Sequence, residues 1–114
     1  MTGFGLKKAD KLLNRSDFVA LRSGKSVSDR YFIVAFRPGV MERTRLGVTV
    51  TRKVGCAVIR NRIKRIVREF YRLNRKRIRG AWDINVIAKH GAAQMKTDRA
   101  FASLAALMDR IRGD

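Results

Sequence analysis

The chain has 114 residues, of which 46% are hydrophobic; this allows one domain around one core and excludes a disordered basic tail. Its 27 Lys and Arg residues against 9 Asp and Glu residues give a formal net charge of +18. Because so much like charge destabilises a compact protein, the composition predicts a polyanionic partner, with nucleic acid first and an anionic membrane surface second.

The single cysteine, Cys56, excludes an internal disulfide and a cysteine-based zinc site. The start MTGFGLKKADKLL has no apolar signal-peptide core, and no window approaches the roughly 18 apolar residues of a membrane span. These features predict a soluble, cytoplasmic protein with a single domain over residues 1–114.

The first expected element is a short helix. Residues 1–10, with two glycines and several lysines, are expected to be flexible. In RSDFVALRSGK (15–25), Phe18 and Leu21 share one helical face, and Gly24 can end the helix.

Three strands are expected next. YFIVAF (31–36) is β-branched and aromatic, and RLGVTVT (45–51) alternates apolar and other residues. A loop of roughly 39–44 would join these two as an antiparallel pair, and DINVIAK (83–89) is the third strand. Trp82, at the entry of the third strand, is expected to be a surface anchor that packs on helix ends.

The last expected element is a helix from Thr97 or Asp98 to about Arg112. Its apolar stripe consists of Phe101, Leu104, Leu107, Met108 and Ile111. With the long helix described next, the order is α-β-β-α-β-α, which predicts an α+β fold of one sheet packed by helices.

The segment AVIRNRIKRIVREFYRLNRKRIRG (57–80) carries ten Arg or Lys residues and one acid, Glu69. At 100° per residue it forms a two-sided helix. The expected core-facing stripe is Ile59, Ile63, Ile66, Val67, Phe70 and Leu73. The outward side carries Arg60, Lys64, Arg68 and Arg72 in succession at i, i+4.

This outward side is not well explained as a surface that only contacts water, because like charges at i, i+4 destabilise a helix by about 0.2–0.5 kcal/mol per pair. The pattern therefore indicates binding to a polyanion, and arginine suits bidentate contact with phosphate. Asn61 could contact a base edge or a 2′-hydroxyl, or could cap a helix turn. The segment by itself leaves RNA, DNA and lipid open.

Catalytic groups are not predicted. The nine acids are scattered, whereas a two-metal nuclease needs several carboxylates around one cavity. His90 is the only histidine, so a pair of imidazoles within one chain is excluded, and it is expected on a surface or loop. Cys56 is expected to be a small buried side chain where the basic helix begins. The chain should bind, and any cutting would come from its partner.

The segment TRKVGCAVIRNRIKRIVRE (51–69) resembles the signature of the bacterial ribonuclease P protein component family. The family's RNR motif, which opens a long helix, matches Arg60-Asn61-Arg62. KLLNRSDFVALRSGK, LGVTVTRKVG and DINVIAKHGAA resemble further family stretches in the same order.

The resemblance implies a subunit of a ribonucleoprotein that removes the 5′ leader from precursor tRNA. The RNA subunit would carry the catalytic site and the divalent metal ions (Mg²⁺), and the protein would bind no metal itself. The resemblance also implies a left-handed crossover from the second strand through the basic helix to the third, although such crossovers are right-handed in about 98% of proteins.

Two sets of binding residues follow from the resemblance. For the RNA subunit, these are Arg60, Asn61, Arg62, Lys64, Arg65 and Arg68. For the single-stranded leader, in a cleft between the first helix and one sheet face, they are Phe18, Arg22, Ile33, Ala35, Thr49, Thr51, Arg52, Lys53, Lys89 and His90. The chain departs from the family at Arg22, usually aromatic, at Ala35, often tyrosine, and at His90, usually basic. Fewer rings imply that leader binding depends more on charge.

Three other functions are open. A ribosomal or general RNA-binding structural protein fits the charge and fold, and only the motif argues against it. A DNA-reading helix is third, because no partner helix and short turn precede the basic helix. Membrane binding is weakest, since the sheet needs the apolar stripe and that stripe contains no tryptophan.

Overall fold

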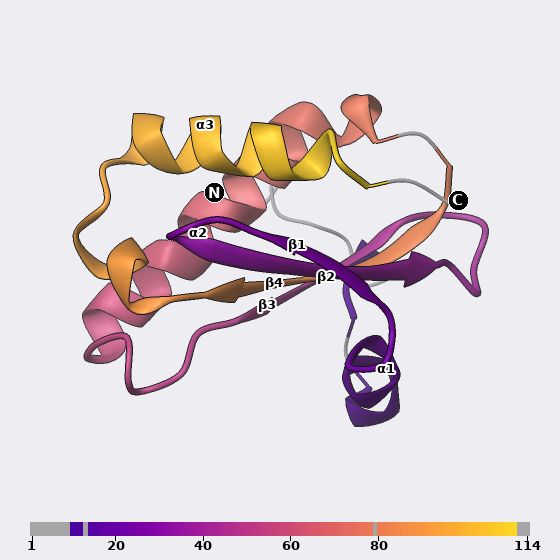
Figure 1. Cartoon of the computed structure of the whole chain (residues 1–114), viewed down its shortest axis with the longest axis horizontal. Helices are drawn as coiled ribbons and strands as arrows, with labels where there is room; N and C mark the ends of the chain where they lie inside the picture. The colour runs from indigo at the N-terminus through magenta and orange to yellow at the C-terminus, as the bar shows by residue number, and fades with distance from the viewer. Residues whose placement is uncertain (1–9, 13, 79, 112–114) are drawn as a thin grey trace.

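The computed structural model describes residues 10–12, 14–78 and 80–111, and shows one sheet with helices on both faces (Figure 1). This confirms the predicted α+β class. Two short 3-10 turns, 75–77 and 90–94, follow α2 and β4. The helices and strands are α1 (Arg15–Leu21), β1 (Lys25–Ser28), β2 (Phe32–Pro38), β3 (Arg45–Thr49), α2 (Ala57–Asn74), β4 (Trp82–Ala88) and α3 (Thr97–Met108).

The strand order in the sheet is β1-β2-β4-β3. Strand β4 is antiparallel to β2 and parallel to β3, so Val86 is paired with Val34 on one side and Val48 on the other. The predicted direct pairing of the strands at 31–36 and 45–51 is therefore wrong. Since Asp83, Ile84, Asn85 and Val86 are all buried, β4 has to be covered on both faces and takes the centre of the sheet.

The connection from β3 through α2 to β4 joins two parallel strands, as the resemblance implied. Its left-handed sense stays a prediction.

Strand β1 was not predicted, and the observed order is α-β-β-β-α-β-α. Its sequence KSVS is polar, and Val27 is its only partly buried residue, as suits a short edge strand. The turn into β2 is held by the Asp29 carboxylate, which accepts the N–H groups of Tyr31 (2.8 Å) and Phe32 (2.9 Å).

The main core lies between the sheet and helices α2 and α3 (Figure 1). Most of the predicted α2 stripe is buried there: Ile63, Ile66, Val67 and Phe70. Leu73 is instead 57% exposed, and Tyr71 takes the inward position. The reason is that the last turn of α2 packs on the β2–β3 loop, where the Tyr71 hydroxyl donates to the Thr44 carbonyl at 3.5 Å.

Helix α3 ends at Met108 rather than near residue 112, which lies outside the described residues. Leu104, Leu107 and Met108 of its predicted stripe are buried, and Phe101 and Ile111 pack at the edge of the core. Trp82 packs edge-to-face on Phe36, with ring centroids 5.7 Å apart. No helix within the described residues is long and apolar enough to cross a membrane.

The N-terminal segment is docked from Asp10 onward. Asp10 is 3% exposed and forms ion pairs with Arg43 (2.9 Å) and Arg75 (3.2 Å). The Leu12 N–H donates to the Leu46 carbonyl at 3.0 Å, which places the segment along the outer edge of β3. Of the segment expected to be flexible, Asp10 is the one residue that the structure describes, and these ion pairs tie it to Arg43 and Arg75. Residues 1–9 lie outside the described residues, and the flexibility of the segment stays a prediction.

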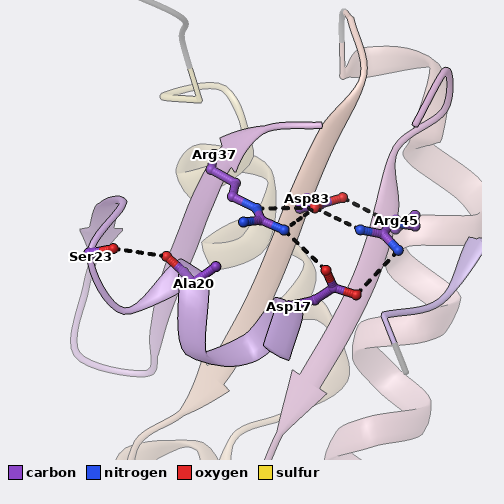
Figure 2. A network of polar contacts seen from close by, with 6 residues as sticks. All are labelled: Asp17, Ala20, Ser23, Arg37, Arg45 and Asp83. Atoms are coloured by element: carbon purple, nitrogen blue, oxygen red, sulfur yellow. Dashed lines mark hydrogen bonds and ion pairs between the residues drawn. The ribbon is translucent and has the colours of Figure 1, made fainter. Parts of the chain in front are cut away.

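A four-residue ion network fixes α1 on the sheet face opposite α2 and α3 (Figure 2). Arg37, Asp83 and Arg45 are aligned across β2, β4 and β3. Asp83, with no exposed surface, accepts from Arg37 (Nη2, 2.9 Å) and Arg45 (Nη2, 2.8 Å). Asp17, in the first turn of α1, accepts from the same two guanidinium groups at 3.1 and 3.4 Å. Two carboxylates and two guanidinium groups thus balance their charges under the helix.

Replacing Asp83 should be strongly destabilising. Asp83→Ala leaves two guanidinium groups beside the sheet with a single remaining carboxylate, and removing one partner of a buried ion pair costs about 3–5 kcal/mol of unfolding free energy. Urea denaturation measures this. Asp109→Asn, which breaks the exposed pair with Arg77, is the matched control and should change little. Equal, small effects of both substitutions would contradict the role assigned to the network.

Candidate nucleic-acid interface

The sheet face that carries α1 is only partly covered by it. Leu12, Leu21 and Ala35 form a small buried cluster against Phe18. The next residues across the sheet, Ile33, Ile87 and Thr49, are aligned with one another and half-buried. This row forms a shallow floor beside α1 that side chains from the strand ends surround.

Phe18 lies at the boundary between covered and open surface. Its ring is half-buried and rests on Gly47: a Cβ atom at Gly47 would be 2.6 Å from Phe18 Cε1 and 2.8 Å from Cζ. Arg22 is exposed one helical turn later. Ala35 is 7% exposed and lies within the cluster under α1, so it supports the helix and forms no part of the open surface.

Cationic side chains gather where β3 and β4 end. Because these strands are parallel, the exposed Thr51, Arg52 and Lys53 follow β3 at the same end of the sheet where Lys89 and His90 follow β4. Of the ten predicted leader-binding residues, the structure therefore brings nine to the open floor, its α1 side or this rim, and places Ala35 beneath α1.

Arg30 was missed by the sequence analysis but belongs to the same rim. It is exposed in the β1–β2 turn, with its guanidinium 5.7 Å from the centre of the Tyr31 ring. The Tyr31 carbonyl accepts the N–H of Lys89 at 2.8 Å, which places this turn beside the end of β4. Placing Arg30 at this rim requires knowing that residues 25–28 form strand β1, and the polar sequence of that strand gave no signal for it.

Asp29 organises that rim. Its backbone carbonyl accepts from Lys89 Nζ at 2.6 Å, and its carboxylate accepts from the Ser103 hydroxyl of α3. Burial alone would raise the pKa of Asp29. The hydrogen bonds from Ser103 and from the N–H groups of Phe32 and Tyr31, together with the charge of Lys89, outweigh burial and lower that pKa.

On α2, the six predicted RNA-binding residues differ in how they are held. Arg60 Nε donates to the Gly55 carbonyl at 3.2 Å, and Arg62 Nη2 donates to the Met95 carbonyl at 2.5 Å. Lys64 is half-buried, while Asn61, Arg65 and Arg68 are exposed on the outer face. Cys56 rather than Asn61 is at the N-cap position of the helix. We refer to Arg60, Asn61, Lys64, Arg65 and Arg68 as the α2 ridge.

Cys56 is exposed, so its predicted burial is wrong: the N-cap position places the side chain outside the helix. The backbone N–H groups of Ile59 and Val58 at the start of the helix lower the pKa of the thiol, with a further contribution from Arg60. His90 is exposed, as expected. Among the described residues, no group of three His, Cys, Asp or Glu side chains could hold a metal ion.

The fold, the cationic rim at the ends of β3 and β4, and the α2 ridge together define a small α+β RNA-binding protein. A family model described as "Ribonuclease P" matches residues 6–112. The ribonuclease P protein component of Desulfatibacillum aliphaticivorans is 48% identical over 112 residues, covering 97% of this chain and 95% of that protein. The corresponding protein of Geotalea uraniireducens is 41% identical over 112 residues, with 97% and 98% coverage.

Solved structures agree. The ribonuclease P protein of Thermotoga maritima superposes with a TM-score of 0.83 at 37% identity, covering 90% of this chain and 98% of that one. The Staphylococcus aureus protein gives a TM-score of 0.82 at 36% identity, with 89% and 94% coverage. The chain belongs to the ribonuclease P protein family, and is thus a protein component of an endoribonuclease ribonucleoprotein.

The contact between Phe18 and Gly47 can be tested by a double-mutant cycle. Gly47→Ala should displace the Phe18 ring and lower the unfolding free energy by about 1–3 kcal/mol, the usual effect of overpacking. In a Phe18→Leu background, which lacks the ring tip, the same substitution should cost clearly less. Urea denaturation of the four proteins measures the coupling; additive effects would contradict the contact.

The lowered pKa of Asp29 predicts a pH-dependent stability. A carboxylate whose pKa falls on folding stabilises the protein above its ordinary pKa of 3.8, and this contribution is lost as the pH falls through the folded-state pKa. Asp29→Asn should therefore cost about 1–2 kcal/mol at pH 7, toward the low end for hydrogen bonds to a charged group because Asp29 is only half-buried. The difference from the unaltered protein should shrink below pH 3.8 in urea denaturation. A difference independent of pH would contradict the assignment.

Proposed function

We propose that this protein is the subunit of ribonuclease P that binds the catalytic RNA through the α2 ridge and holds the 5′ leader of precursor tRNA in the cleft beside α1. The RNA subunit performs the hydrolysis that matures the tRNA 5′ end. The observation that carries the proposal is the α2 ridge: a single helix face with four cations and one amide, opened by the Arg60-Asn61-Arg62 sequence.

Hydrogen bonds from two arginines at the start of α2, one in the ridge and one beside it, support binding to a folded RNA. Arg60 and Arg62 are each held by a backbone carbonyl, so less side-chain entropy is lost when they meet phosphates. A guanidinium group has five N–H donors, so one such bond leaves others for a phosphate. Asn61, exposed between them, can contact a base edge or a 2′-hydroxyl.

The cleft has the two components of a single-strand site. The half-buried Phe18 ring offers a surface on which a base can stack, and Arg52, Lys53 and Lys89 surround the floor with positive charge. With Arg22 exposed on α1 and Ala35 beneath it, no second ring comes from those two positions. The leader is therefore held more by charge than by stacking.

The protein's contribution to the reaction is electrostatic. Cations on the ridge and the cleft rim reduce the repulsion between the negative charges of the RNA subunit and those of the leader. This favours both substrate binding and occupation of Mg²⁺ sites in the RNA. We place the divalent metal ions in the RNA subunit, the catalytic residues outside this chain, and the complex in the cytoplasm.

Removing two exposed ridge cations tests the RNA-binding role. Arg65→Ala with Arg68→Ala should weaken binding to a bacterial ribonuclease P RNA and reduce the slope of log affinity against log salt by about 1.5, at roughly 0.7–0.9 per phosphate contact. Cleavage of precursor tRNA by the reconstituted complex should fall at low magnesium. The matched control removes the same charge from α3 and its end, with Arg99→Ala and Arg110→Ala.

Three outcomes would contradict the proposal. Equal salt slopes for the ridge and control variants would remove the ridge from RNA binding. Capture of mainly ribosomal RNA by the chain would favour the general RNA-binding alternative. Cleavage of precursor tRNA by the purified protein, freed of nucleic acid, would contradict catalysis by the RNA.

A further inference from the structure

A groove of about 550 Å³ runs between α2 and α3, on the other face of the sheet from the α1 cleft. Several of its lining residues are not among the RNA-binding or leader-binding residues that the family resemblance implies. The lining residues are Arg62, Arg65, Ile66, Glu69, Arg72, Thr97 and Phe101. Three arginines against one glutamate give the groove a formal charge of +2.

The arginines of the groove are held in different ways. Arg62 spans from α2 to the Met95 carbonyl, just before α3, and so fixes one end. Arg65 is exposed and belongs to the α2 ridge as well. Arg72 forms a bidentate pair with Glu69, at 2.9 and 2.8 Å, on the exposed surface of α2. A phosphate entering the groove can replace Glu69 as the partner of Arg72, because both present oxygen pairs to the same fork.

Phe101 supplies an aromatic wall. Its ring is half-buried and meets the buried Phe70 edge-to-face, with centroids 5.4 Å apart and an interplanar angle of 76°. Phe70 thus supports the ring from the core side, while the remainder of Phe101 borders the groove. A fixed aromatic ring beside guanidinium groups is the combination that binds an unpaired nucleotide: the ring stacks a base and the cations hold the backbone.

We propose that the α2–α3 groove binds an unpaired segment of the RNA subunit, with a base on Phe101 and the adjoining phosphates on Arg65 and Arg72. The inference rests on the proposed function and extends it to a second RNA contact. The RNA subunit is the occupant because the groove is continuous with the α2 ridge through Arg65, whereas the leader cleft lies on the opposite face of the sheet.

Arg72→Gln and Phe101→Leu give different, separable signatures. Arg72→Gln should weaken binding to a bacterial ribonuclease P RNA and lower the salt slope by about 0.7–0.9, the value for one phosphate. Phe101→Leu should weaken binding about five-fold or more at every salt concentration with the slope unchanged, because stacking involves no counterion release. Glu69→Gln should tighten binding about two-fold, since it removes a negative charge from the groove. Circular dichroism and urea denaturation confirm that each variant is folded.

The matched control is Arg110→Gln, an exposed cation beyond the end of α3, which should leave the affinity near that of the unaltered protein. Unchanged RNA affinity of folded Arg72→Gln, while Arg65→Ala with Arg68→Ala remains defective, would overturn the groove proposal and leave the proposed function intact. The groove proposal would also be overturned if Arg72→Gln left the RNA affinity unchanged but weakened binding of precursor tRNA to the assembled complex, because the substrate would then be the occupant. If the unaltered protein fails to bind the RNA subunit, the proposed function itself fails.

Discussion

The ion network of Asp17, Arg37, Asp83 and Arg45 is the constraint on which the arrangement of this protein depends. Three of its members are aligned across three strands, and the fourth comes from α1 (Figure 2). A short helix of seven residues contributes little stability by itself, so its position depends on what it contacts. By fixing α1 over one end of the sheet face, the network leaves the row of Ile33, Ile87 and Thr49 uncovered.

The sheet separates two surfaces with different chemistry. On one face, α1 contributes the half-buried Phe18 ring and the strand ends contribute a cationic rim. On the other, α2 and α3 cover the core (Figure 1). The ridge lies on the outer side of α2, and the groove lies between α2 and α3. Asp29 contacts both sides: its carbonyl holds Lys89 of the rim, and its carboxylate accepts from Ser103 of α3. Under the proposed function, this protein contacts one RNA segment on each face, and the sheet between them keeps their negative charges apart.

The sequence predicted what depends on local pattern. Helix α2 was predicted because its apolar period and its cationic sequence are continuous, and α3 because of its stripe. The order of the strands could not be predicted from local patterns, since the interior place of β4 depends on pairing with residues 38–56 positions away. The network was missed for the same reason: residues 17, 37, 45 and 83 have no shared spacing, and only the register brings them together. Tyr71 replaced Leu73 because the last turn of α2 meets the N-terminal segment and the β2–β3 loop, which helical periodicity does not describe.

The two outer edges of the sheet, on β3 and on β1, differ in whether another segment of the chain lies along them. Residues 11 and 12 lie along the outer edge of β3, while the outer edge of β1 carries no strand among the described residues. Strand β1 has four residues, with Lys25, Ser26 and Ser28 exposed. A second copy of the chain could therefore pair only with a short, polar edge strand, and the positive charges of the two copies would repel each other strongly. The same charge that recruits RNA therefore also protects the free polypeptide from self-association through its sheet.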